Sequence, residues 1–144
     1  MAKDININFE VVGKIRGKQR PRFYHNSVYT PAETVAYEKS IRVALHEQVP
    51  EIKELDTELN TDKKYFVNIV ARFKIPQRKS KAEKEKLLHD RYCTKKPDLD
   101  NITKIVLDAL NGVVWKDDKN VVTVHAVKLW DANDERLIVS IEDM

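Results

Sequence analysis

The stretch from residue 98 to residue 112 constrains the fold more than any other part of this sequence. At 100° per residue, its apolar side chains share one face and repeat with the i, i+3, i+4, i+7, i+8 spacing of a buried helical stripe. The stripe consists of Ile102, Ile105, Val106, Ala109 and Leu110. Gly112 follows as a typical stop signal for a helix. The pattern predicts a helix from Asp98 or Leu99 to Asn111 with one face in the core.

Apolar and β-branched residues predict strands around this helix, either by alternation with polar residues or as β-rich runs. The predicted strands cover residues 5–12, 27–29, 65–75, 121–129 and 136–141, and a polar turn at 131–135 joins the last two. A further helix is expected to about Gln48, with Thr30 as N-cap and Pro31 as its first residue. A short helix is expected at 80–89, and residues 49–62 read as acidic and irregular.

Length and composition predict a single domain. The 144 residues are 42% apolar and include one cysteine, Cys93. No disulfide can form within the chain, and a cysteine-based zinc site is not expected. We expect one α+β (mixed α/β) domain over residues 1–144, with a central sheet flanked by helices. No secretion signal or membrane-spanning stretch is visible, which predicts a cytoplasmic protein that contacts no membrane.

Basic residues gather in two regions, although the net charge is only +3. The first region contains Lys14, Arg16, Lys18, Arg20 and Arg22. The second contains Arg78, Lys79, Lys81, Lys95 and Lys96, and it runs directly into the segment with the aspartates. Such clusters are either solvated surface or a face that binds phosphates with salt-dependent affinity. Their position beside carboxylates, which would otherwise repel DNA, favours DNA binding.

Two groups of aspartates flank the predicted helix. Asp98 and Asp100 lie at its start, where the positive end of the helix dipole favours carboxylates. Asp117 and Asp118 follow its end and precede the predicted strand at 121–129. The helix and the return of the chain could bring both groups to one edge of the sheet. From spacing alone, a structural role is also open, in which Asp98 caps the helix and Asp100 pairs with Lys104.

Clustered carboxylates are the ligands that a hard cation such as Mg²⁺ prefers. Such ions bind a scissile phosphate and lower the pKa of an attacking water. Lys104, one turn after Asp100, could add positive charge toward the transition state. The residue types therefore suit phosphodiester hydrolysis if they meet in space.

The segment KPDLDNITKIVLDALNGVVWKDD, from Lys96 to Asp118, resembles the signature of RusA-type Holliday junction resolvases of bacteria and phages. Upstream, RGKQRPRF and VYTPAET resemble the N-terminal pattern of that family. The resemblance implies metal-binding catalytic roles for Asp98, Asp100 and Asp118, and a catalytic role for Lys104. Asp117 matches a further acidic position that can ligate the metal.

The same resemblance implies a RusA-like homodimer that uses Mg²⁺, with Mn²⁺ as a possible substitute, and no small-molecule cofactor. Its implied activity is paired nicking of four-way DNA in recombination and repair, and a two-fold dimer supplies two equivalent sites for two cuts. Two alternatives remain. One is a metal-dependent nuclease for other branched or single-stranded DNA, and the other is a non-catalytic basic protein that binds nucleic acids.

The aromatic residues and histidines carry weaker expectations. Phe23, Tyr24 and Tyr29 flank the first basic region, and we expect them to pack in the core rather than to stack on DNA bases. The two tryptophans at 115 and 130 are expected in the core or an interface. His125 lies in an apolar strand and is expected to be packed in the core.

Overall fold

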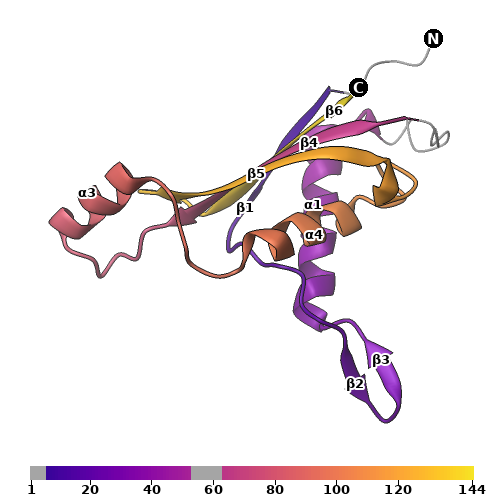
Figure 1. Cartoon of the computed structure of the whole chain (residues 1–144), viewed down its shortest axis with the longest axis horizontal. Coiled ribbons are helices and arrows are strands. Elements are labelled where there is room, and N and C mark those ends of the chain that lie inside the picture. The colour runs from indigo at the N-terminus through magenta and orange to yellow at the C-terminus, as the bar shows by residue number, and fades with distance from the viewer. Residues whose placement is uncertain (1–5, 53–62) are drawn as a thin grey trace.

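The computed structural model describes residues 6–52 and 63–144, and its centre is a twisted four-stranded sheet (Figure 1). The strands are β1 (Asn6–Val12), β4 (Tyr65–Lys74), β5 (Val121–Asp131) and β6 (Arg136–Asp143). Their order across the sheet is β1-β6-β4-β5. β4 and β5 pair in parallel and the other neighbours pair antiparallel, so the sheet is mixed. The predicted α+β class is confirmed.

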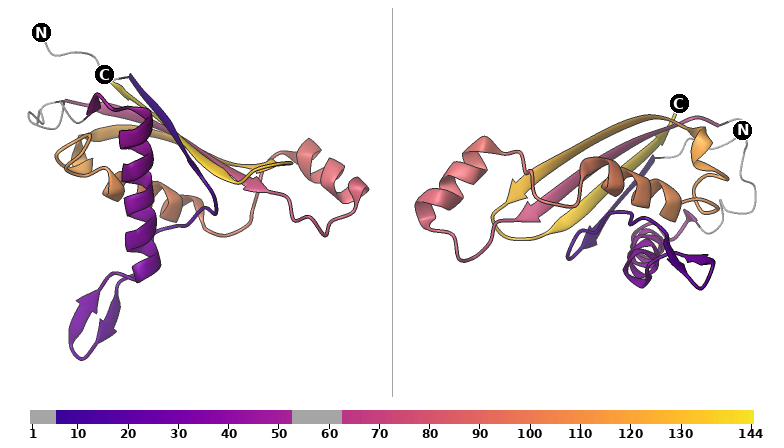
Figure 2. Two further views of the ribbon diagram at one scale, coloured as in Figure 1. Left: turned by 180° about the vertical axis from the view of Figure 1, so that it is seen from behind. Right: turned by 60° about the horizontal axis from the view of Figure 1, so that its bottom comes forward.

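Helices α1 (Ala32–Gln48) and α4 (Leu99–Ala109) lie on the same side of this sheet (Figure 2). Helix α3 (Lys81–Asp90) lies beyond one end of the strands, and the short 3₁₀ helix η2 (Asp118–Asn120) precedes β5. A two-stranded hairpin of β2 (Arg22–Tyr24) and β3 (Ser27–Tyr29) projects from the body near the start of α1. None of the described helices is both long and apolar enough to cross a bilayer.

The core lies between the sheet and the two helices, as the periodicity of the sequence predicted. All five apolar residues of the helical stripe, from Ile102 to Leu110, are fully buried. They face the inward residues of the strands, including Val67, Ile69 and Val139. Each isoleucine, valine or leucine of the stripe contributes about 1.5–3 kcal/mol on burial, so the stripe fixes α4 firmly on the sheet. The helix that carries Asp100 and Lys104 is therefore rigidly placed.

Several boundaries differ from the sequence predictions. Pro31, not Thr30, is the N-cap of α1, and it makes no side-chain capping bond. Strand β2 was not predicted, although the neighbouring strand β3 was. Helix α4 ends at Ala109, and Gly112 with φ +77° lies in the turn that follows. Most of the irregular segment predicted at 49–62 lies outside the described residues.

Two predictions of core packing are wrong. Phe23, Tyr24 and Tyr29 are 79%, 66% and 45% exposed, because the hairpin that carries them leaves the body of the domain. His125 is exposed because β5 is an edge strand, and its ring lies 3.1 Å from Oδ1 of Asn68. Trp115 is buried as predicted, and Trp130 is half-buried against the core.

Strand β5 extends two residues further than predicted because Asp131 organises the turn into β6. One carboxylate oxygen of Asp131 accepts hydrogen bonds from the backbone N–H groups of Asn133 and Asp134, at 2.8 and 3.0 Å. The other accepts from Nε of Arg72 at 2.9 Å. Burial raises the pKa of Asp131, but these donors outweigh it and hold the pKa at about 2. The ionised carboxylate therefore stabilises the fold.

Asp131→Asn should lower the free energy of unfolding by about 2 kcal/mol at pH 7. Because the folded pKa lies below the ordinary value of roughly 4, this stabilisation is fully present above pH ~4 and disappears as the pH falls toward 2. Urea unfolding of both proteins at pH 7 and at several acidic pH values measures the difference. Asp134→Asn, in the same turn but exposed, is the control and should change little. An equal loss at pH 7 and pH 2 would contradict an ionic contribution.

Candidate active site

The carboxylates at the start of α4 are not used for local stabilisation. Asp98 is the N-cap by its backbone, with φ −67° and ψ 151°, and its carbonyl accepts from the N–H of Ile102 at 3.1 Å. Its side chain, however, makes no capping hydrogen bond. Asp100 is exposed and makes no ion pair with Lys104, as judged over the described part of the chain. The cap and the helical ion pair that would explain these residues structurally are therefore not formed.

Asp100, Lys104 and Asp118 surround one hollow of about 490 Å³ between α4 and the edge strand β5. Leu99, Thr103, Leu107, Val124 and Ala126 form the rest of its wall. Asp100 and Lys104 stand one turn apart on α4, and Asp118 comes from η2. Asp100 and Asp118 are separated in the sequence by the rest of α4 and the loop after it, yet they line the same hollow at one edge of the sheet.

The return loop after α4 places Asp117 and Asp118, and Trp115 anchors it. Trp115 is 1% exposed, its Nε1 donates to Oδ1 of Asn111 at 2.9 Å, and its ring centroid lies 5.6 Å from that of Tyr65. The N–H of Gly112 donates to the carbonyl of Trp115 at 2.7 Å and closes the turn. The loop then enters η2, where the backbone N–H of Lys119 donates to the Asp117 side chain at 3.3 Å.

Negative charge is concentrated at the end of this loop. A hydrogen bond between the side chains of Asp117 and Asp118 lowers the pKa of Asp117 and raises the pKa of Asp118. Partial burial and the charges of Asp117 and Asp108 raise the pKa of Asp118 further, and Lys104 opposes them weakly. Like charges this close disfavour one another, and a bound cation would relieve that repulsion.

The carboxylate oxygens of this hollow are ligands of the kind that a hard divalent cation prefers. No three Asp, Glu, His or Cys side chains within residues 6–52 and 63–144 stand close enough together to enclose an ion. Mg²⁺ commonly uses only one or two protein carboxylates and keeps waters or substrate oxygens as its other ligands. Asp100 and Asp118 line one hollow and are the two carboxylates there that could supply such ligands. That Asp98 shares the same ion stays a prediction.

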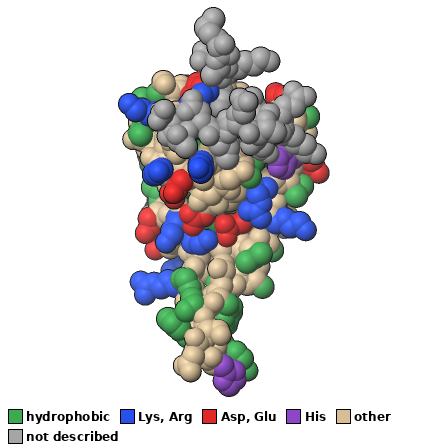
Figure 3. Space-filling model, turned by 90° about the vertical axis from the view of Figure 1, so that its right-hand side faces the viewer, with side chains coloured by type: hydrophobic (Ala, Val, Ile, Leu, Met, Phe, Trp, Pro, Cys, Tyr) green, Lys and Arg blue, Asp and Glu red, His purple; other side chains and the backbone are tan. Residues whose placement is uncertain are grey.

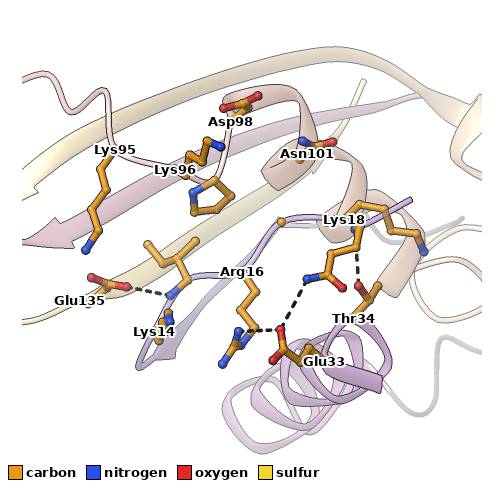
Figure 4. Close-up of a pocket in the computed structure, with 14 residues that line it drawn as sticks. Lys14, Arg16, Lys18, Glu33, Thr34, Lys95, Lys96, Asp98, Asn101 and Glu135 are labelled. Carbon is orange, nitrogen blue, oxygen red and sulfur yellow. Dashed lines mark hydrogen bonds and ion pairs between the residues drawn. The ribbon is translucent and has the colours of Figure 1, made fainter. Parts of the chain in front are cut away.

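Asp98 instead lines a neighbouring groove of about 490 Å³, shown in Figure 4. The first basic region contributes three cations to it and the second contributes two, beside two glutamates: Lys14, Arg16, Lys18, Lys95, Lys96, Glu33 and Glu135. The two basic regions, some 80 residues apart in the sequence, therefore meet beside the start of α4. The five cations outnumber the three carboxylates of this groove, so its charge suits the phosphates of a nucleic acid.

The first basic region is held tightly against α4. A β-carbon at Gly17 would lie 2.8 Å from Cβ of Pro97 and 2.9 Å from Cβ of Asn101, so only glycine allows this approach. The backbone N–H of Lys18 donates to the carbonyl of Asn101 at 2.8 Å. The basic groove and the aspartate helix are thus parts of one packed unit.

The ten predicted DNA-binding residues divide into two groups. Three of them are paired with carboxylates: Arg16 with Glu33 at 3.0 Å, Lys79 with Glu83 at 3.7 Å, and Lys18 with both Glu38 and Asp108. The other seven make no ion pair with a described residue; they are Lys14, Arg20, Arg22, Arg78, Lys81, Lys95 and Lys96. Figure 3 shows acidic side chains gathered on one face with lysine and arginine side chains around them.

Lys18 lies at the junction of α1, α4 and the first basic region rather than on an open surface. Its ammonium group is 3.1 Å from Glu38 and 3.2 Å from Asp108, and its side chain is 19% exposed. Burial lowers the pKa of Lys18, but the hydrogen bonds to Glu38 and Asp108 outweigh it and raise the pKa. Lys18 neutralises a carboxylate one turn beyond Lys104 and ties the three segments together.

Sequence reasoning missed two glutamates that shape the groove. Glu135 accepts from the backbone N–H of Ile15 at 2.9 Å across 120 residues of sequence, and Glu38 holds Lys18 from α1. Glu38 belongs to a Tyr-Glu pair in the N-terminal pattern of the family and Glu135 to the polar turn predicted at 131–135, but neither was assigned a role from the sequence. Their partners could not be predicted, because the fold alone brings these segments together.

A hollow with two carboxylates and a lysine, beside a groove with more cations than carboxylates, is an arrangement suited to proteins that cleave nucleic acids. The α+β fold with its mixed sheet agrees with one family of that class. The family model described as endodeoxyribonuclease RusA matches residues 12–142, and the chain belongs to this family. No curated protein matches the sequence significantly. Membership implies an endonuclease that resolves Holliday junctions.

Proposed function

We propose that this protein resolves four-way DNA junctions by paired, Mg²⁺-dependent phosphodiester hydrolysis, and that it acts in the cytoplasm during recombination and repair. The observation that carries the proposal is the hollow in which Asp100, Lys104 and Asp118 meet. A basic groove beside it supplies the binding surface for the DNA backbone. Family membership supplies the substrate class.

In this proposal, Asp100 and Asp118 hold the divalent cation, and waters and phosphate oxygens supply its other ligands. Ligation by Asp98 and Asp117 would require their side chains to move, because no three described carboxylates stand close together. The bound ion supplies Lewis acidity to the scissile phosphate and lowers the pKa of the attacking water. Mn²⁺, which accepts the same oxygen donors, is the expected substitute.

Lys104 carries positive charge on the same helix face as Asp100. It stabilises the negative charge that develops on the phosphate as water attacks phosphorus and the bond to the leaving oxygen breaks. The cleavage leaves a phosphate on one end of the strand and a hydroxyl on the other. The unpaired lysines and arginines hold the flanking phosphates and orient the branch without reading its sequence.

The proposed assembly is a homodimer, because resolving one junction requires two symmetric cuts. A second copy has a suitable surface on the open side of the sheet, which no described helix covers. Five apolar side chains lie there only half-buried: Phe66, Val70, Val127, Leu129 and Ile138. Apolar side chains exposed in this way are stabilised when another surface covers them.

The test is a four-way junction with a mobile core, incubated with the protein in Mg²⁺ or in EDTA. We expect paired, symmetric nicks in Mg²⁺ and none in EDTA, where binding persists and weakens steeply with salt. Both nicks should appear within the lifetime of one complex if the protein is a dimer. Flaps, forks and single strands of the same sequence serve as competing substrates.

Two outcomes would contradict the proposal. Tight junction binding with no cleavage in Mg²⁺ or Mn²⁺ would identify a non-catalytic binding protein. Equal or faster cleavage of flaps or single strands would identify a metal-dependent nuclease with another substrate.

A further inference from the structure

The β2–β3 hairpin exposes more apolar surface than its size explains. Phe23, Tyr24, Val28 and Tyr29 are 79%, 66%, 60% and 45% exposed, and the hairpin projects away from the sheet and helices (Figure 1). Its turn has two residues, His25 and Asn26, with φ of 45° and 65°. This is the form of two-residue turn that matches the twist of paired strands, so the hairpin holds a defined shape. A defined projection with exposed aromatic rings indicates a binding surface.

The register divides the hairpin into two faces. Arg22 pairs with Tyr29 and lies on the same face as Tyr24, whereas Phe23 pairs with Val28 on the other face. One face therefore combines a guanidinium group with two phenol rings, and the other is apolar. Arg22 makes no ion pair with a described carboxylate. Aromatic rings beside free arginine are the combination that binds unpaired nucleotides, with rings on the bases and the cation on a phosphate.

The charge near the hairpin favours DNA over a second copy of this chain as the partner that binds its exposed aromatic residues. From Val11 to Ala32 the sequence contains five lysines and arginines and no aspartate or glutamate, and three of the five make no ion pair with a described residue. Two such hairpins facing each other would bring like charges together, whereas a polyanion complements them. The hairpin also follows directly in the chain from residues 14–19, which line the basic groove beside Asp98.

We propose that the aromatic residues of the β2–β3 hairpin stack on bases that are unpaired at the branch point of the DNA, and that this stacking selects branched over linear duplex DNA. The inference rests on the proposed function, because it names the feature of the junction that the protein recognises. In a continuous duplex every base is already stacked on its neighbours, so the rings gain contacts only where the stack is interrupted.

The test measures binding in EDTA, where no cleavage occurs, to a four-way junction and to a linear duplex of the same arm sequence. Phe23→Thr with Tyr24→Thr removes both rings but keeps residues that favour strands. We expect junction affinity to fall about tenfold or more, while duplex affinity changes less than about twofold. The slope of affinity against salt should not change, because no phosphate contact is lost. The matched control, Phe23→Tyr with Tyr24→Phe, keeps both rings and should bind like the wild type.

A fluorescent base analogue at the branch point gives a second readout. Its emission should change when the wild-type protein binds, and this change should be absent with the double threonine variant. Unchanged junction affinity and emission in that variant would overturn the inference. So would a reduced salt slope, which assigns the loss to phosphate contacts, or dissociation of a dimer in sedimentation, which assigns the hairpin to chain association. Failure of the proposed function is distinguished by wild-type protein that does not cut the junction in Mg²⁺.

Discussion

Asp100→Asn should reduce the rate of junction cleavage by about 10²–10³-fold or more, while folding and junction binding are retained. Asp100 is exposed, has no hydrogen bond or ion pair to a described residue, and faces the hollow that Asp118 and Lys104 share. Its amide replacement fits the same space but loses the charge that holds a divalent cation. Single-turnover cleavage at saturating protein and Mg²⁺ measures the loss directly.

Binding separates this role of Asp100 from a structural one. The variant removes a negative charge near a basic groove, so its affinity for DNA in EDTA should equal or exceed that of the wild type. Asp90→Asn, at the exposed end of α3, makes the same chemical change away from the hollow and should leave cleavage unchanged. Cleavage by Asp100→Asn at the wild-type rate would refute a ligand role. Loss of folding would instead show that Asp100 stabilises the helix.

Trp115→Ala should lower the free energy of unfolding by about 3–5 kcal/mol and also reduce cleavage by the molecules that remain folded. The side chain is 1% exposed, packs near Tyr65 and donates a hydrogen bond to Asn111. Its removal leaves a cavity and an amide acceptor without its partner. Because Trp115 anchors the loop that carries Asp117 and Asp118, the hollow should lose its geometry before the whole domain unfolds.

Two further variants distinguish stability from positioning. Trp115→Phe keeps most of the ring but not the donor to Asn111, and it should cost about 1 kcal/mol beyond the change in volume. Trp130→Ala removes a half-buried tryptophan from β5, far along the strand from η2, and should destabilise without changing cleavage per folded molecule. Urea unfolding gives the stability. Cleavage measured without urea, at a temperature well below the thermal unfolding transition, gives the activity. Equal activity per folded molecule in Trp115→Ala would remove the positioning role.

Helix α4 both packs in the core and carries residues that line the hollow, so part of the site could be predicted from the sequence. The buried stripe and the aspartates lie on one short helix, and the spacing of both sets follows from helical geometry alone. The stripe from Ile102 to Leu110 is buried as its periodicity predicted. The meeting of Asp100 with Asp118 required the return loop, whose path depends on the burial of Trp115.

Exposure was the property that the sequence predicted least well. Burial was predicted for His125 from its apolar strand and for Phe23 from its aromatic side chain, yet both are exposed. A strand pattern states which residues share a face, but not whether another layer covers that face. Lys18 shows the converse case: it belongs to a basic cluster that predicted an open surface, and two distant carboxylates enclose it.

By itself, the sequence determined the helical stripe of α4, most strands, the two basic regions and the pattern of aspartates that resembles the RusA family. Each of these depends on residues within a few turns or strand positions of one another, where backbone geometry fixes which side chains are neighbours. Only the tertiary structure decided that the basic regions share one groove, that Lys18 is paired, that the hairpin projects and that one side of the sheet is open. These features depend on contacts between segments far apart in the chain, and no local spacing encodes which surfaces the packed core leaves exposed.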